Sequence, residues 1–185
     1  MTMIESRIHA VRFYQDAASL CHIAGDFVAD GLLSDRPAIV IATPEHRQGL
    51  EERLVQRGVE VAASTTCGDL VMLDAEDTLA RFMQDGMPDP ASFVKTIGPV
   101  IEATRGATRR IPCAYGEMVD VLWKTGHTRA ASRLERLWNN LSRTLPFSLL
   151  CGYAIGSVYH GGDVDEICSH HSHVLSEGGE VTALA

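Results

Sequence analysis

Polar side chains that could do chemistry follow four predicted strands, at the points where the strands end. They are Thr43 and His46 after one apolar run, Asp74 after the next, Glu117 after a third, and Tyr153 in a fourth. Because the carboxyl ends of parallel strands meet at one edge of a sheet, we expect these side chains to line one ligand-binding cleft. Two carboxylates and one imidazole disfavour a bare anion and suit a cation, an amine or a hydroxyl-bearing molecule.

Most of these residues also have a structural explanation. Thr43 and Asp74 stand where helix N-caps are expected, and Tyr153 lies in an apolar run that is typical of a core strand. Glu117 is the least explained, because the preceding Gly116 lets a ligand or another backbone come close. If two of the carboxylates are buried side by side, one pKa should be raised, and a protonated His46 would relieve the repulsion.

A second group of potential ligands lies near the C-terminus. Cys168, His170, His171 and His173 fall within six residues, and on a helix Cys168 and His171 would share one face. This set is the alternative metal site, with zinc as the natural ion. We favour a packing interpretation, in which His171 contacts Ile167 and Cys168, because no second ligand pair of matched spacing is present. We therefore expect no metal and no other cofactor.

Nucleotide chemistry lacks its usual motifs. The phosphate loop GxxxxGK[ST] is absent, and the two lysines, Lys95 and Lys124, do not follow a glycine at the required spacing. The dinucleotide motif GxGxxG and the nucleophile motif GxSxG are also missing. The remaining catalytic alternative is a residual nucleotide- or metal-binding enzyme that uses Glu117 and Asp74 with a divalent cation.

The elements that must position these residues alternate between strands and helices. The apolar runs predict strands at 8–14, 38–42, 59–62, 70–73, 109–115 and 148–154. Helical periodicity begins after 16, 43, 74, 89, 117, 127 and 163, and the last helix should hold the C-terminal histidines. This alternation predicts one α/β domain with three layers, a mostly parallel sheet with helices on both faces.

Composition and charge restrict the binding partners and the cellular location that we expect. The chain has 185 residues and a formal net charge of −8, which disfavours direct binding of nucleic acid or of an anionic membrane. Its five cysteines are an odd number at irregular spacing, which does not indicate a disulfide framework. No signal peptide and no run of about 20 apolar residues is present, so we expect a cytoplasmic protein without a membrane segment.

Seven segments in order resemble the MEDS family, the sensory domains of methanogens and methylotrophs. They are HAVRFY (9–14), IATPEH (41–46), DAEDTL (74–79), GEMV (116–119), LERLWN (134–139), FSLLCGY (147–153) and ICSHHS (167–172). The resemblance covers residues 8–176, which we expect to form a single domain between flexible termini at 1–7 and 177–185. It implies a RecA-like core with a degenerate phosphate loop, in agreement with the missing lysine.

The same resemblance implies signal sensing without catalysis. Members of the family are often attached to a histidine kinase or to a DNA-binding segment. Seven residues precede the domain and about nine follow it, so we expect the output to lie on a partner protein, a histidine kinase or a transcription regulator. The small-molecule ligand is not named by the resemblance, and self-association of the chain stays open.

Overall fold

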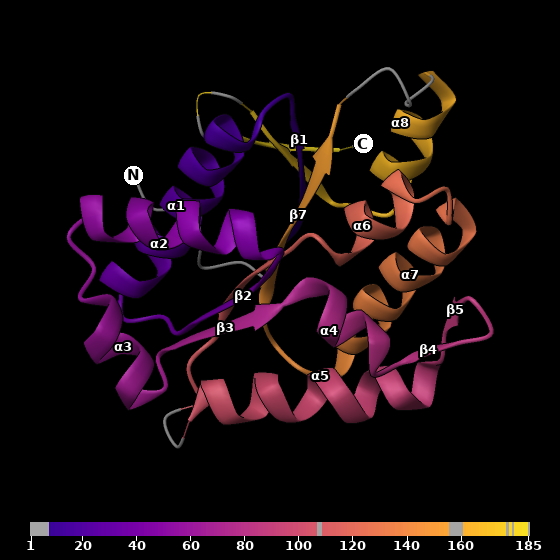
Figure 1. The fold of residues 1–185 in the computed structure, drawn as a ribbon. Coiled ribbons are helices and arrows are strands. Elements are labelled where there is room, and N and C mark those ends of the chain that lie inside the picture. Colours follow the sequence, from indigo (N-terminus) through magenta and orange to yellow (C-terminus); the bar gives the residue numbers. More distant parts are fainter. Residues whose placement is uncertain (1–7, 107–108, 156–160, 177, 179, 185) are drawn as a thin grey trace.

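The computed structural model describes residues 8–106, 109–155, 161–176, 178 and 180–184. The predicted flexible N-terminus, 1–7, lies outside this range, whereas most of the predicted flexible C-terminus, 177–185, lies inside it and includes a strand at Val181–Ala183. A seven-stranded sheet runs through the middle of the molecule in the order β3-β2-β6-β7-β1-β8-β9 (Figure 1). The strands are β1 (His9–Tyr14), β2 (Ala38–Ala42), β3 (Leu70–Asp74), β6 (Cys113–Gly116), β7 (Ser148–Ala154), β8 (His173–Leu175) and β9 (Val181–Ala183). A separate small hairpin pairs β4 (Met83–Gln84) with β5 (Met87–Pro88).

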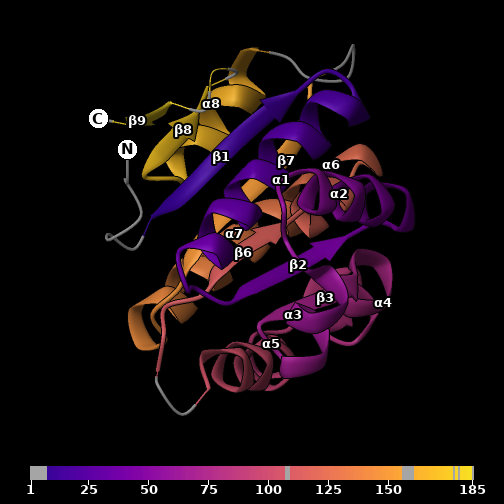
Figure 2. The same ribbon diagram turned by 90° about the vertical axis from the view of Figure 1, so that its left-hand side faces the viewer.

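Helices cover both faces of the sheet, which confirms the predicted fold class. The helices are α1 (Ala17–Leu33), α2 (Pro44–Gln56), α3 (Val61–Cys67), α4 (Ala75–Ala80), α5 (Pro90–Arg105), α6 (Met118–Lys124), α7 (Thr128–Thr144) and α8 (Gly161–Ser169). Helices α1 and α2 lie on one side of the sheet, in front of it in Figure 2, and α6, α7 and α8 lie on the other side (Figure 1).

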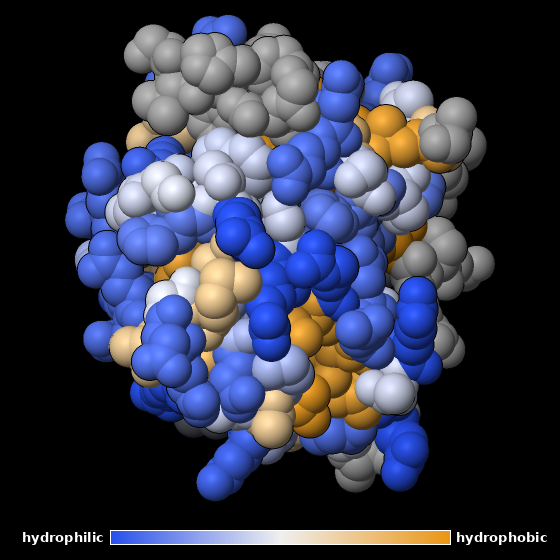
Figure 3. Space-filling model, turned by 90° about the vertical axis from the view of Figure 1, so that its right-hand side faces the viewer, coloured by the Kyte–Doolittle hydropathy of each residue, from blue (hydrophilic) through white to orange (hydrophobic). Residues whose placement is uncertain are grey.

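Two apolar clusters fill the space between these layers. Leu20, Phe27 and Leu50 join the α1–α2 side to the sheet, whereas Leu134 and Trp138 join α7 to the opposite face. The outward side of the α6–α7 layer is mainly hydrophilic, with one apolar strip (Figure 3). Such amphipathic helices bury one stripe and solvate the other, as the 3.6-residue periodicity predicts.

The main-sheet ladders are parallel, except that β8 and β9 pair antiparallel. Strand β2 is followed by β3 toward one edge, whereas β6 is followed by β7 in the opposite direction. The connections after the neighbouring strands β2 and β6 therefore diverge, which leaves a topological switch point at their carboxyl ends. Open α/β sheets place their ligand crevices at such points.

Three local predictions need correction. The segment predicted as a strand at 59–62 leads instead into helix α3, which has no buried residue to place in a sheet and ends at Gly68 with φ +84°. The last helix ends at Ser169, so the C-terminal histidines lie beyond it, and Cys168 does not share a helical face with His171. Strands β8 and β9 follow it, where only helix and tail were expected.

Close backbone approach and ion pairs fasten α2 to α1. A Cβ atom at Gly49 would lie 2.7 Å from Cys21 Sγ, and one at Gly25 would lie 2.5 Å from Arg53 Cγ. Arg53 also donates to both carboxylate oxygens of Asp26, at 2.8 and 3.0 Å. The two helices therefore form one packed unit above the sheet.

Candidate functional site

Glu117 stands at the switch point and joins three elements. It follows β6 directly, and its carboxylate accepts a hydrogen bond from the backbone N–H of Thr43, in the turn after β2. Its other oxygen lies 2.6 Å from Nδ1 of His46, in the first turn of α2. Glu117 is 1% exposed and His46 is 8% exposed, so water scarcely reaches this pair. Three of the five predicted site residues therefore meet as the sequence suggests.

The electrostatics of this pair favour an imidazolium facing a carboxylate. The hydrogen bond that His46 donates to Glu117 raises the pKa of His46 above its ordinary value, although burial opposes the shift. Burial would raise the pKa of Glu117, but the hydrogen bond and charge of His46 outweigh it, and the pKa is lowered. The raised carboxylate pKa expected for neighbouring acids is therefore not found at Glu117, because its neighbour is a histidine.

Two tyrosines complete the surroundings of the pair. The hydroxyl of Tyr115, in β6, donates to Oε2 of Glu117 at 3.0 Å, and the ring of Tyr14 meets the ring of His46 edge-on at 5.9 Å. Gly152, in the neighbouring β7, makes room for Tyr115, because a Cβ there would lie 2.8 Å from its hydroxyl oxygen. The Glu117 carboxylate therefore has contacts with donor groups of Thr43, His46 and Tyr115.

The polar edge continues past Tyr14 toward β7. The Tyr14 hydroxyl donates to Oδ2 of Asp120 at 2.7 Å, and Nζ of Lys124 lies 2.7 Å from the same oxygen. The other oxygen of Asp120 accepts from the backbone N–H of Ala154 at 3.0 Å. Sequence reasoning missed these residues, although Asp120 follows Glu117 by three positions and so faces the same way from the first turn of α6.

Asp74 borders the site without entering its hydrogen-bond network. Its carboxylate caps α4 by accepting from the N–H groups of Glu76 and Asp77, as predicted, and it accepts from Arg47 at 3.1 Å. It also lies in register with Ala42, the last residue of β2. Asp74 therefore stands at the same edge, one strand away, and connects to α2 through Arg47.

Tyr153 lies on the opposite face of the sheet, in the apolar cluster under α7. Its hydroxyl donates to Oε1 of Glu135, a fully buried carboxylate of α7, at 2.7 Å. Strand β7 is buried on both faces, so its apolar sequence did not reveal which way each side chain points. The structure thus places Tyr153 with a different set of residues.

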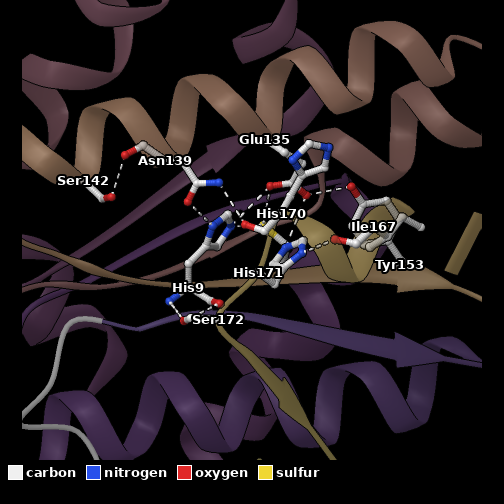
Figure 4. Close-up of polar contacts among 10 residues, drawn as sticks. His9, Glu135, Asn139, Ser142, Tyr153, Ile167, His170, His171 and Ser172 are labelled. Carbon is white, nitrogen blue, oxygen red and sulfur yellow. Dashed lines mark hydrogen bonds and ion pairs between the residues drawn. The ribbon is translucent and has the colours of Figure 1, made fainter. Parts of the chain in front are cut away.

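That second set is a buried polar cluster of four side chains, of which Figure 4 labels His9, Glu135 and His171. Its members are His9 from β1, Glu135 from α7, Cys151 from β7 and His171 just beyond α8. Nε2 of His9 lies 3.2 Å from one Glu135 oxygen, and Nε2 of His171 lies 3.4 Å from the other. Burial would raise the pKa of Glu135, but the charges of His171 and His9 lower it well below the ordinary range.

Only His171 of this cluster belongs to the C-terminal set singled out in the sequence. The other members could not be predicted because they are far apart in the sequence. His9 and Cys151 come together only through the β1–β7 register, in which Cys151 pairs with Val11. One signal was available: Glu135 interrupts the apolar stripe of Leu134 and Trp138 on α7. A carboxylate on a buried helical face needs a partner, since an unpaired buried charge is costly.

Fold and site together describe an α/β domain whose polar residues gather at the carboxyl edge of a parallel sheet. The family model of the MEthanogen/methylotroph, DcmR Sensory domain matches residues 8–172. The chain therefore belongs to the MEDS family, as the resemblance in the sequence suggested.

Comparison with solved structures supports the fold. The crystal structure of an uncharacterized protein from Pyrococcus horikoshii, in complex with an unknown peptide, has a TM-score of 0.68 and 14% identity. The match covers 98% of this chain and 85% of that chain. No curated protein sequence matches this chain significantly. Within the described part of the chain, no helix combines the length and the hydropathy that a membrane crossing requires.

Proposed function

We propose that this chain is a cytoplasmic ligand-sensing module, which binds a small molecule at the carboxyl edge of its sheet and signals to a partner protein. Membership of a sensory family supports the sensing role. The position of Glu117 carries the proposed site, because this one carboxylate holds the end of β6, the turn after β2 and the start of α2 together. A ligand that competes for Glu117 changes all three contacts at once.

The chemistry of the site selects the class of ligand. Glu117 accepts hydrogen bonds and His46 is the cationic partner, so an amine or a hydroxyl group can replace His46 or Tyr115 as a donor. A bare anion would be repelled by the carboxylate of Glu117 and by that of Asp74 at the border of the site. We therefore propose a small amine or hydroxyl-bearing molecule, bound by Thr43, His46 and Glu117.

The signal would pass through α2. A ligand that binds better when His46 is released shifts the population toward a displaced α2. Because Gly49 and Arg53 pack α2 against α1, the two helices would move as one unit. We propose that a histidine kinase or a DNA-binding transcription regulator reads this change, as the family's role in sensing suggests.

We propose that the domain has no catalysis of its own, on a RecA-like core that has lost its phosphate loop. In support, the turn after β2 contains Pro44 and Glu45, where a phosphate would need N–H donors. The alternative, a nucleotide- or metal-dependent enzyme using Glu117 and Asp74, predicts hydrolysis of ATP with Mg²⁺. We expect the purified protein to hydrolyse ATP no faster than its Glu117→Gln variant.

Thermal unfolding tests the proposed site. Wild-type protein would be melted with a panel of simple primary amines and alcohols, and separately with ATP and Mg²⁺. We expect at least one amine or alcohol to raise the Tm of the wild type and of Glu51→Gln, an exposed control on α2, but not of Glu117→Gln. Equal stabilisation of the Glu117→Gln variant, or stabilisation by ATP alone, would refute the proposed site.

A further inference from the structure

The buried polar cluster offers four potential metal ligands from four separate elements. One ligand atom from each of His9, Glu135, Cys151 and His171 lies within 4.8 Å of all the others. Glu135 is 0% exposed, Cys151 1% and His171 7%, so the ligand atoms lie inside the protein, and Figure 4 shows His9 and His171 directed at Glu135. A mixed set of two imidazoles, a thiol and a carboxylate is a donor set that zinc accepts.

Both histidines are oriented by a hydrogen bond on the far side of the ring. Nδ1 of His171 donates to the carbonyl oxygen of Ile167 at 2.7 Å. Nδ1 of His9 lies 2.9 Å from Oδ1 of Asn139, and the Asn139 amide is itself oriented because its Nδ2 donates to the carbonyl of His170 at 2.8 Å. In each ring Nε2 therefore points into the cluster, which is the arrangement that supports a metal-bound histidine.

One of these inward nitrogens has no hydrogen-bond partner. Nε2 of His171 is buried among the described residues without a hydrogen bond, although it stands 3.4 Å from a Glu135 oxygen. In the neutral ring whose Nδ1 carries the proton, Nε2 presents a lone pair toward a carboxylate. Two lone pairs facing each other away from water require a cation between or beside them, either a proton on Nε2 or a metal ion.

Three of the four ligand atoms are spaced as they would be around a tetrahedral ion. Zinc–ligand distances of about 2.0–2.3 Å place the ligand atoms of a tetrahedron about 3.3–3.7 Å apart. Nε2 of His9 lies 3.2 Å from Glu135 and 3.4 Å from Cys151 Sγ. Cys151 Sγ lies 3.8 Å from the same Glu135 oxygen, whereas Nε2 of His171 lies 3.4 Å from the other carboxylate oxygen.

We propose that His9, Glu135, Cys151 and His171 bind one divalent transition-metal ion, with zinc as the best-matched member of that class. The thiolate and the carboxylate together neutralise its charge, and the thiol proton leaves to solvent on binding together with any proton on Nε2 of the two histidines. Four protein ligands leave no open position, which is typical of a structural site. The ion ties β1, β7 and α7 to the segment after α8, and so anchors the C-terminal part of the domain.

The proposal departs from the absence of zinc expected from the sequence, and it assigns different ligands. Of the C-terminal set, Cys168 and His170 are half-buried side chains outside the cluster, and only His171 takes part. This difference provides matched controls. Cys168→Ser and His170→Ala change the same residue types, close in the chain, without touching the proposed ligands.

The experiment uses the full chain, freed of metal by dialysis against a chelator and then titrated with Zn²⁺ and, separately, Co²⁺. We expect about one ion per chain for the wild type, for Cys168→Ser and for His170→Ala. The cobalt form should show the charge-transfer absorption of a thiolate ligand, which Cys151→Ser should lose and Cys168→Ser should keep. His171→Ala should weaken zinc binding by tenfold or more, on the order expected when a ligand is lost.

Three results would overturn the proposal. They are wild-type protein that takes up no stoichiometric zinc, a cobalt form without thiolate absorption, and binding that fails in Cys168→Ser but persists in Cys151→Ser. In the first case a proton on His171 would be the only cation in the cluster. Because the wild-type titration and its cobalt spectrum need no variant, the test stands even if Cys151→Ser does not fold.

Discussion

Two buried glutamates organise the polar interior, and each is stabilised by histidine. Glu117 faces His46 at the carboxyl edge, and Glu135 faces His9 and His171 under α7. Both residues are at most 1% exposed. Removing one member of such a pair leaves the other buried without a partner, which costs more than the pair itself contributes.

Replacing Glu117 by glutamine should destabilise the fold while nearly preserving its shape. The amide keeps an acceptor for the N–H of Thr43, but it no longer balances the charge of His46. We expect a loss of about 1–3 kcal/mol in the free energy of unfolding, measured by urea denaturation. Glu51→Gln on the exposed side of α2 should change it by less than about 0.5 kcal/mol.

The same pair predicts a pH dependence. The pKa of His46 is raised above 6.5. The stability that protonated His46 contributes to the fold is therefore complete below pH 6.5 and is lost as the pH rises through the raised pKa. The pKa of Glu117 is lowered below 4.5. The stability that ionised Glu117 contributes to the fold is therefore complete above pH 4.5 and is lost as the pH falls through the lowered pKa. The pair should therefore stabilise the protein most between pH 4.5 and 6.5.

Urea unfolding of the wild type and Glu117→Gln across pH measures this window. The stability difference between them should be largest inside it and should shrink as the pH rises above it. Subtracting the variant removes the contribution of the Glu135 cluster, which both proteins share. A difference that grows toward alkaline pH would show that His46 is not the cationic partner of Glu117.

At the scale of elements, glycine sets the distance between α1 and α2. Alanine at Gly49 would place its Cβ 2.7 Å from Cys21 Sγ and 3.2 Å from Cys21 Cβ. Gly98 in α5 is a contrast, because a Cβ there would meet only Val94 Cγ1, at 4.0 Å. Gly49 in α2 is thus packed tightly against a neighbouring helix, whereas Gly98 in α5 is not.

Gly49→Ala should destabilise the protein by more than Gly98→Ala. Alanine favours a helix over glycine by about 1 kcal/mol, and at Gly98 this gain is opposed by the ring of the following Pro99, which restricts the residue before it, and not by contacts with another helix. At Gly49 the overlap forces α2 away from α1, at a cost of about 1–3 kcal/mol typical of overpacking. Thermal unfolding monitored by circular dichroism measures both; a rise in Tm for Gly49→Ala would contradict the packing described.

Sequence patterns predicted the larger elements and missed the smaller ones for physical reasons. The buried run at 38–42 and the amphipathic stripe of α7 have strong periodicities that tertiary contacts do not override. The segment after Val59 has β-branched residues that favour strand, yet the hydroxyls of Thr65 and Thr66 bond back within a helix. Strand β8 has three residues, too few for a pattern, and exists because β1 offers an edge.

At the scale of the molecule, the topology explains which parts of the site were predictable. Parallel strands bring their carboxyl ends to one edge, so the meeting of Thr43, His46 and Glu117 follows from strand order. The sequence could not separate Tyr153 from them, because a strand buried on both faces hides its orientation. The cluster around Glu135 depends on contacts between distant segments, which one sequence without its fold does not reveal.

Native mass spectrometry tests the central claim, that the carboxyl edge around Glu117 binds a small molecule. Wild type and Glu117→Gln would be purified gently from the cells that produce the protein and compared with the same samples after denaturation. We predict that the native wild type retains a small organic molecule, lost on denaturation and reduced in Glu117→Gln. Equal retention by both proteins, or a wild type that carries no organic molecule, would contradict the account.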